Sequence, residues 1–249
     1  MHFQEQIRRE IVPLLFFGTV ITIKVYFLVD ALFIEANYRK ILQAIHLLNQ
    51  YHDEVVRDWL IKILSYTVYN IVAILFDALV FMSYLIRNEA REKAKGFWET
   101  VFPLFTILLP VVVFTLWSIP SIRESAPRFD PAYAETLFIS GVILGLIGAT
   151  LSIIALWSLK HSFSLMAEVR ELVTSGMYSR IRHPLYMSEL IHMTGIALLA
   201  DTPVALWLLL IGLGIQIARA KIEEGKLQGV LPEYAAYKRQ TGFLWPKVL

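Results

Sequence analysis

Four stretches of this chain are apolar over about the length of a membrane-crossing helix: residues 11–34, 60–86, 101–119 and 137–159. A helix needs about 20 mostly apolar residues to cross the hydrocarbon core of a bilayer. The chain of 249 residues is 57% hydrophobic and only 18% charged, whereas an ordinary globular chain is about 25% charged. The sequence therefore predicts an all-α, polytopic integral membrane protein.

A fifth apolar region, residues 185–218, consists of two shorter runs separated by Asp201-Thr202-Pro203. Each run is about 15 residues long, which is marginal for crossing a hydrocarbon core about 30 Å thick. A helical hairpin fits this pattern best, because a short turn returns the second run to the side from which the first began. The sequence leaves open whether this hairpin crosses the whole bilayer.

The stretch 137–159 carries small residues at a spacing that suits close packing of membrane helices. Gly141 and Gly145 form a small-xxx-small pair, and Gly148 and Ala149 extend the same smooth face. Small residues let two helix backbones approach closely in lipid, where no hydrophobic force drives helices together. We therefore expect this helix to pack tightly on a neighbour.

Lysine and arginine are distributed unevenly between the two sides that these spans define. With the N-terminus in the cytoplasm, 16 of the 23 Lys and Arg residues fall on the cytoplasmic side and five on the opposite side. Cytoplasmic loops of membrane proteins carry an excess of these residues. We therefore expect both termini, the segment 160–184 and the tail 219–249 to lie in the cytoplasm.

The composition also excludes several classes of function. A net charge of +2 without a basic tract gives no reason to expect a nucleic-acid partner. The absence of cysteine excludes disulfides, thiolate metal sites and cysteine nucleophiles. His46 and His52 have no third ligand at helical spacing, so no metal site is predicted. The apolar run after Arg9 is too long for a cleavable signal peptide, and we expect it to be the first span.

Several polar residues lie inside the first two spans, where an ionisable side chain is costly and usually faces protein or a water-filled cavity. Two interpretations remain open. These residues form the polar wall of a substrate cavity, with Asn70 and Asp77 on the substrate side, or they form a buried pair such as Lys24 with Asp77. Snorkelling to the membrane edge is a variant of the second. The residues concerned are Lys24, Asp30, Lys62, Tyr66, Asn70 and Asp77.

A polar cluster, SGMYSRIRHPLYMSEL at residues 175–190, precedes the hairpin. Pro184 suits the first turn of a helix because it lacks a backbone N–H and has a fixed φ. The residue before it, His183, is pushed toward an extended conformation. The unpaired N–H groups of the first helical turn, together with Arg180 and Arg182, predict a site for a carboxylate or phosphate. A basic loop that follows only the positive-inside rule is the alternative.

Aromatic and flexible residues in the same cluster add to this site. Tyr178 and Tyr186 offer ring faces that can contact an adenine ring or a cation. Gly176 permits a tight turn before them. These side chains make the cluster suitable for a ligand that is both aromatic and charged.

A second constellation follows the hairpin. Glu223 lies four residues after Arg219, the spacing of a helical ion pair, and Glu224 follows it. Because a hairpin returns to its starting side, these residues are expected to lie close to Arg182, His183 and Tyr186. A ligand that carries both a carboxylate and an ammonium group would suit two such lobes of opposite charge.

Together these segments resemble the isoprenylcysteine carboxyl methyltransferase family, within the wider group that includes phospholipid N-methyltransferases. The resemblance covers about residues 160–249, so we divide the chain into a transmembrane region, 1–159, and a catalytic region, 160–249. Residues 1–159 resemble the family only as a set of apolar spans. The matching segments are HSFS at 161–164, RELVTSGMYSRIRHPLY at 170–186, the arginine followed by EE at 219–224, and PEYAAYKRQTGFLWP at 232–246.

The resemblance implies an integral membrane methyltransferase that uses S-adenosylmethionine in a non-Rossmann site. In this family the methyl acceptor enters from the lipid between helices. We expect Arg219 to orient an anionic acceptor or polarise the site, and Glu223 to hold the ammonium group of the cofactor or to fix Arg219. By position, the cofactor contacts would involve Leu172, Val173, Gly176, Tyr178, Arg182, His183, Pro184, Tyr186, Glu223 and Glu224.

One position departs from the family pattern. Family members often have a small residue soon after the tyrosine, as in RHPxYxG, but this chain has Met187-Ser188-Glu189. Glu189 is therefore a candidate on the acceptor side. A carboxylate acceptor of the prenylcysteine type needs no base, whereas a phospholipid amine or a small thiol must lose a proton. Glu223, Glu189 and His183 are the candidate bases for that case.

Two other functions remain as alternatives. Sterol-reductase-like enzymes share an RHPxY pattern but bind a nicotinamide cofactor. A transporter or membrane scaffold would use the polar residues within the spans, although the sequence has no inverted repeat of the kind common in transporters. The sequence does not determine the acceptor.

Overall fold

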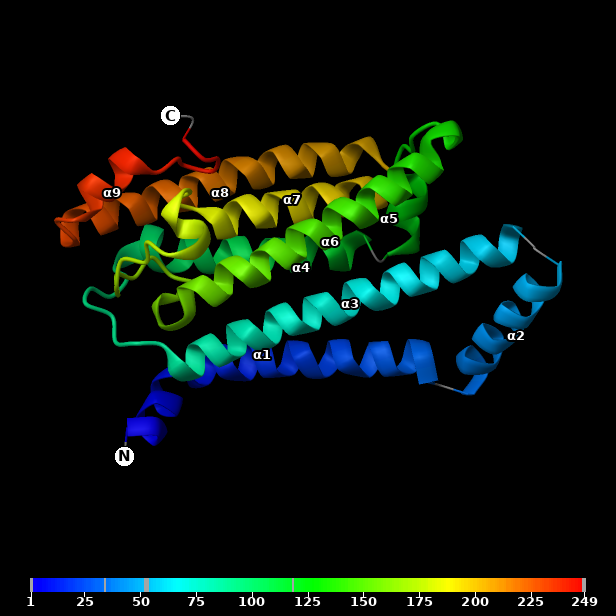
Figure 1. Ribbon diagram of the computed structural model, residues 1–249, viewed down its shortest axis with the longest axis horizontal. Helices are drawn as coiled ribbons and strands as arrows, with labels where there is room; N and C mark the ends of the chain where they lie inside the picture. Colours follow the sequence, from blue (N-terminus) through cyan, green and yellow to red (C-terminus); the bar gives the residue numbers. More distant parts are fainter. Residues whose placement is uncertain (1, 34, 52–53, 118, 248–249) are drawn as a thin grey trace. The chain divides into compact units, whose positions relative to one another are not determined.

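The computed structural model of the protein describes residues 2–33, 35–51, 54–117 and 119–247, and over these residues it is helical, without strands. Two compact units divide at residue 85: residues 1–85 and residues 86–249. Figure 1 shows the long helices of the second unit running along one another. The predicted all-α class is therefore confirmed.

Unit 1 contains three helices, α1 (His2–Phe33), α2 (Glu35–Tyr51) and α3 (Glu54–Ile86). Helices α1 and α3 pack against each other through aromatic side chains. The rings of Phe17 and Tyr84 stack with their centroids 6.1 Å apart, and Gly18 leaves room for the ring of Phe81. His52 lies outside the described residues.

Lys24 and Asp77 form an ion pair within this unit, with Lys24 Nζ 2.6 Å from Asp77 Oδ2. Each residue lies in an apolar helix, where an unpaired charge would be strongly disfavoured. Lys24 and Asp77 are thus paired, as one of the two interpretations of the polar residues in the spans expected, although the Lys24 side chain is 35% exposed. Asn70, the other substrate-side candidate, lies two helical turns before Asp77 on α3.

Four helical segments are long and apolar enough to cross a membrane in the part of the chain that the structure describes: Glu10–Asp30, Glu54–Ile86, Pro131–Ser162 and Pro203–Val230. Three coincide with expected spans. The expected span 101–119 is instead a π-helical turn, Phe97–Val101, followed by the short helix α4 (Phe102–Trp117) and then α5 (Pro120–Ser125). Pro120 begins α5, and the residue before a proline is disfavoured in a helix.

The fourth long helix is the second leg of the hairpin. Helix α7 (Pro184–Leu199) has 16 residues, but α8 (Pro203–Val230) has 28 and extends well past the apolar run. Its polar end, RAKIEEGKLQ, is rich in good helix formers, so the helix continues. It ends before Leu231-Pro232, where the proline disfavours further helix. Arg219 and Glu223, which were predicted on a tail, therefore lie on this helix.

Helices α6 (Ala134–Leu159) and α7 touch backbone to backbone through glycines. A Cβ added to Gly148 would lie 2.3 Å from the backbone nitrogen of His192, and one added to Gly195 would lie 2.3 Å from that of Gly145. The His192 ring lies 3.0 Å from the Gly145 carbonyl oxygen. The predicted close packing of the glycine face is confirmed. This packing explains why α6 belongs to the same compact unit as the hairpin. The division based on the resemblance had instead assigned α6 to the transmembrane region, 1–159.

Candidate active site

The RHP segment is held by the C-terminal tail of unit 2. Backbone N–H groups of Arg182 and His183 donate to the carbonyl oxygens of Gly242 (2.9 Å) and Phe243 (3.1 Å). Pro184 begins α7 as predicted, and His183 precedes the helix with φ −124° and ψ 57°. The tail thus fixes the backbone from which the Arg182 and His183 side chains project.

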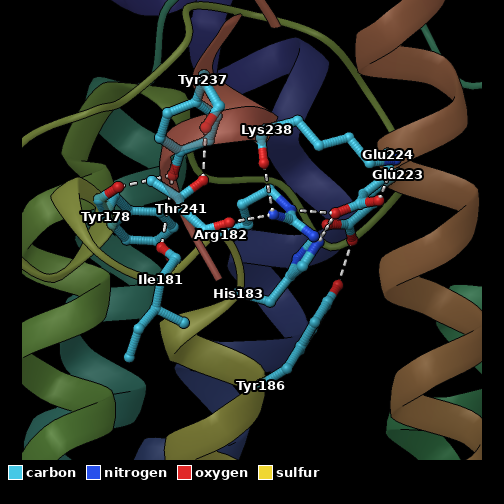
Figure 2. A network of polar contacts seen from close by, with 10 residues as sticks. All are labelled: Tyr178, Ile181, Arg182, His183, Tyr186, Glu223, Glu224, Tyr237, Lys238 and Thr241. Atoms are coloured by element: carbon cyan, nitrogen blue, oxygen red, sulfur yellow. Dashed lines mark hydrogen bonds and ion pairs between the residues drawn. The ribbon is translucent and has the colours of Figure 1, made fainter. Parts of the chain in front are cut away.

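Glu224 is the centre of a cluster of charges (Figure 2). Its carboxylate lies 2.5 Å from Arg182 Nε, 2.9 Å from Lys238 Nζ and 3.4 Å from His183 Nε2. Arg182 also donates to the backbone carbonyl oxygens of Lys238 and Thr241. Glu224 therefore joins α8, the RHP segment and α9 (Tyr234–Gln240), which are far apart in sequence.

Tyr186 connects this cluster to Arg219 and Glu223. Its hydroxyl donates a hydrogen bond to the Glu223 carboxylate (Figure 2). Its ring stacks on the His183 ring at a centroid distance of 5.6 Å, and the Arg219 guanidinium lies 5.0 Å from its centroid. Arg219 is buried and also donates to the carbonyl oxygen of Leu165 at 3.3 Å. The tyrosine ring thus contacts both a cation and a histidine ring.

A pocket opens beside these residues, and its cavity volume is about 120 Å³. One wall is the loop 162–173, and the other is formed by the first turn of α7, the polar end of α8, and α9. The walls offer apolar side chains, tyrosine rings and charges of both signs. The lining includes Phe163, Glu168, Arg170, Leu172, Val173, Tyr178, Arg182, His183, Leu185, Tyr186, Glu223, Lys226, Leu227, Tyr234 and Tyr237.

A buried charge cluster holds the loop wall in place. Glu168 lies 2.8 Å from Arg170 Nη2 and 3.7 Å from Arg87 Nη1, and it accepts a hydrogen bond from Ser164. Arg170 Nε also donates to the carbonyl oxygen of Asn88 at 2.7 Å. Burial opposes ionisation of Glu168, but Arg170, Ser164 and Arg87 outweigh it and hold its pKa below the ordinary value. Arg87 and Asn88 are about 80 residues from Glu168 and Arg170, and the sequence analysis did not find the cluster.

Three buried tyrosines, Tyr178 before α7 and Tyr234 and Tyr237 in α9, form part of the other wall. Tyr237 donates to the carbonyl oxygen of Tyr178 at 2.7 Å, and burial is the main cause that raises the pKa of Tyr237 to about 12. Burial likewise raises the pKa of Tyr178 and Tyr234. These hydroxyls therefore stay neutral near pH 7, and that of Tyr237 acts as a donor. The buried Tyr234 hydroxyl makes no hydrogen bond with the described residues, although Glu224 lies nearby.

The structure brings most of the predicted residues together. Pro184 and Glu224 lie behind the lining and position it, whereas Arg219 lies against the Tyr186 ring. Gly176 has φ +59°, and a Cβ there would lie 2.7 Å from Ser158 Oγ, so the predicted tight turn requires glycine. Asn70 and Asp77 lie in unit 1. The predicted residues that line the pocket are Leu172, Val173, Tyr178, Arg182, His183, Tyr186 and Glu223.

The donors and acceptors of the pocket fit an aromatic, zwitterionic ligand. Glu223 lines the pocket with a carboxylate, and the lining also includes the ion pair of Glu168 with Arg170 and the ammonium group of Lys226, which is paired with Glu99. Leu172, with Val173 beside it, provides an apolar wall for a flat ring. Tyr234 also lines the pocket, and its buried hydroxyl lies near Glu224.

Residues 136–233 match the phospholipid methyltransferase family. The chain is also 28% identical, over 140 residues, to the cobalt-zinc-cadmium resistance protein CzcN of Cupriavidus metallidurans. That alignment covers 55% of this chain and 61% of the relative, so the chain spans less than two thirds of that protein's length. The matched family segment contains α6, the loop wall, the RHP segment and the hairpin. The predicted resemblance to this group of membrane methyltransferases is thereby confirmed.

Proposed function

We propose that this chain is an integral membrane methyltransferase that uses S-adenosylmethionine to methylate a lipophilic acceptor, because residues 136–233 match the phospholipid methyltransferase family. The observation that carries the proposal is the Glu224 cluster. It joins the RHP segment, α8 and α9 around one pocket with charges of both signs. The family match favours methyl transfer over the reductase and transporter alternatives.

S-adenosylmethionine supplies a methyl group bound to a positively charged sulfur, which is already electrophilic. In the proposed site, Glu223 holds the cationic part of this cofactor, and Leu172 and Val173 border its ring. Glu224 acts through Arg182 and His183, because its three partners fix the backbone and the side chains on the pocket wall. The protein then contributes mainly the alignment of donor and acceptor, which lowers the activation barrier by up to about 7–11 kcal/mol in ideal cases.

The acceptor proposed from the resemblance is a lipophilic carboxylate of the prenylcysteine type, and a phospholipid amine or a small thiol is the alternative. Arg219 is the cation that would orient a carboxylate, and its guanidinium is held over the Tyr186 ring. The positive-inside distribution supports a cytoplasmic pocket, with both termini on that side. The acceptor would enter from the bilayer.

The cofactor site is tested by calorimetry of S-adenosylmethionine binding to the purified protein in detergent. We expect His183→Ala and Glu224→Ala each to weaken binding at least tenfold, because each removes part of the cluster behind the pocket wall. Glu233→Ala, which removes an exposed carboxylate outside the cluster, is the matched control and should bind like the wild type. Unchanged affinity in both cluster variants would overturn the site.

The acceptor class needs its own experiment. Transfer of a radiolabelled methyl group would be measured to a prenylcysteine, to phosphatidylethanolamine and to a small thiol. A labelled product from one acceptor identifies the class. If the protein binds S-adenosylmethionine but labels none of the three, the proposed acceptor classes are wrong.

A further inference from the structure

Lys226 is a cation of the pocket wall whose carboxylate partner lies outside the pocket lining. It comes from the polar end of α8, and its side chain is only 7% exposed. Its ammonium group donates to the carboxylate of Glu99 and, at 2.5 Å, to the carbonyl oxygen of Lys93. Both partners belong to the segment 92–99, which pairs with the loop wall through backbone hydrogen bonds. Lys226 therefore connects the pocket to a segment that does not line it.

The partner of Lys226 is more easily released to water than the partners of the two arginines in the lining. Those arginines are held by Glu168 and Glu224, whose side chains are each 9% exposed. The Glu99 side chain is 28% exposed. An exposed carboxylate is hydrated when its ion pair breaks, whereas a buried carboxylate left without its partner is strongly destabilising. Lys226 is thus the cation of this wall that can exchange its partner for a ligand.

Glu99 can leave Lys226 without disrupting the segment 92–99. The Ala167 N–H donates to the backbone carbonyl oxygen of Glu99 at 3.0 Å, so the segment is held on the loop wall independently of the ion pair. The Glu99 carboxylate also accepts a hydrogen bond from the Lys95 N–H at 2.7 Å. It therefore keeps a partner when Lys226 turns away.

The order of charges along α8 suits the amino-acid end of a ligand. Glu223 and Lys226 both line the pocket and are three residues apart on the helix. Residues at this spacing lie on one face, with Cβ atoms about 5–6 Å apart. A carboxylate beside an ammonium group can bind the ammonium and the carboxylate of one α-amino acid. S-adenosylmethionine ends in such a group.

The size of the pocket agrees with an exchange of partners. Its volume is about 120 Å³, whereas small-molecule sites hold about 300–1,000 Å³. A ligand as large as S-adenosylmethionine therefore requires side chains of the wall to move. Because the ion pair of Lys226 with Glu99 ties the α8 wall to the segment on the loop wall, breaking this pair loosens the two walls from each other.

We infer that Lys226 binds the carboxylate of S-adenosylmethionine, and that Glu99 occupies Lys226 until the cofactor enters. This inference rests on the proposed methyltransferase function. Glu223 takes the ammonium group of the same amino-acid end. No covalent bond changes, because one carboxylate replaces another at the same lysine. Neither Lys226 nor Glu99 is among the contacts that the resemblance implies, and Glu99 acts as a built-in competitor of the cofactor.

The test compares S-adenosylmethionine with its decarboxylated form by calorimetry, using the purified full chain in detergent. We expect the wild type to bind S-adenosylmethionine at least tenfold more tightly, because the decarboxylated form has nothing to offer Lys226. Lys226→Met should weaken S-adenosylmethionine binding about tenfold and leave binding of the decarboxylated form within twofold. Lys221→Met, which changes an exposed lysine on the same helix, is the matched control and should alter neither.

Glu99→Gln acts in the opposite direction and guards against a folding defect in the first variant. It keeps the side-chain shape but removes the competing charge, so S-adenosylmethionine binding should tighten about threefold to tenfold. Glu233→Gln, an exposed substitution, should leave it unchanged. If Lys226→Met weakens both ligands equally, or Glu99→Gln does not tighten S-adenosylmethionine binding, the exchange is wrong.

The wild type separates this inference from the proposed function. Equal binding of the two ligands would overturn the assignment of Lys226 and leave the proposed function in place. Failure to bind either ligand would overturn the proposed function itself.

Discussion

Helix α7 packs on its two neighbours in opposite ways. Against α6 the contact is made by glycines, and the two backbones touch at Gly145–Gly195 and Gly148–His192. Against α8 the contact is made by long polar side chains, including Tyr186–Glu223 and Glu189–Gln216. One face of α7 therefore fixes distance, and the other carries charge and hydrogen-bonding groups.

The two faces of α7 therefore have different roles: the face toward α6 holds the helix in place, and the face toward α8 carries the polar groups of the site. A backbone contact through glycine has no side chain that can change rotamer, so α6 and α7 form a rigid pair. The polar face needs such support, because Tyr186 and Glu189 contact Glu223 and Gln216 only if α7 keeps a fixed axial position relative to α8. The following predictions test the two faces separately, beginning with the largest effect.

Gly195→Leu should have the largest effect, because it breaks the face that fixes distance. A Cβ at Gly195 would lie 2.3 Å from Gly145 N and 2.7 Å from the Gly141 carbonyl oxygen, and neither backbone atom can move aside. We expect little monodisperse protein in detergent by size-exclusion chromatography. Gly214→Leu on α8 is the control, because nothing lies within 4 Å of a Cβ there. A well-folded Gly195→Leu variant would contradict the rigid contact.

Arg182→Lys should have a smaller effect, confined to the polar side. Lysine keeps the charge but cannot bind Glu224 and the two carbonyl oxygens of Lys238 and Thr241 at once. Hydrogen bonds to charged groups contribute about 1.5–3 kcal/mol each. We expect a lower unfolding temperature in detergent and at least tenfold weaker S-adenosylmethionine binding. The exposed neighbour Arg180 provides the control, and Arg180→Lys should match the wild type.

Glu168→Gln should have the smallest effect and should depend on pH. The folded pKa of Glu168 lies below its unfolded value, so its carboxylate stabilises the fold above the unfolded pKa. That stabilisation is lost as the pH falls through the folded pKa. We expect a lower unfolding temperature for the variant at pH 7, and a difference from the wild type that shrinks below about pH 4. A difference that stays constant from pH 7 to pH 3 would show that the charge of Glu168 is not the cause.

Much of the architecture followed from local patterns. Apolar length predicted the long helices 11–34, 60–86 and 137–159, and the glycine spacing predicted the close packing of the last one. Pro184 predicted the start of α7. The span expected at 101–119 was less accurate, because apolar composition alone does not show that the helix ends before Pro120. Helix α8 is also longer than the apolar run from which it was predicted.

The site was predicted only in part, for a physical reason. Residues four apart on one helix meet by geometry alone, so Arg219 and Glu223 could be expected near each other. The contacts of Glu168 with Arg87, and of Arg182 with the carbonyl oxygens of the tail, join segments with no fixed spacing. Sequence patterns carry no signal for such contacts.

The sequence by itself determined that this chain is a set of membrane helices with a family-like polar cluster before a hairpin, because apolar length and residue order are local properties. Only the tertiary structure decided which charges neutralise one another. Arg182 is occupied by Glu224 and the tail, whereas Glu189 and Gln216 meet across the hairpin with an acceptor to spare. The pairing of charges depends on distances between helices, and packing sets those distances.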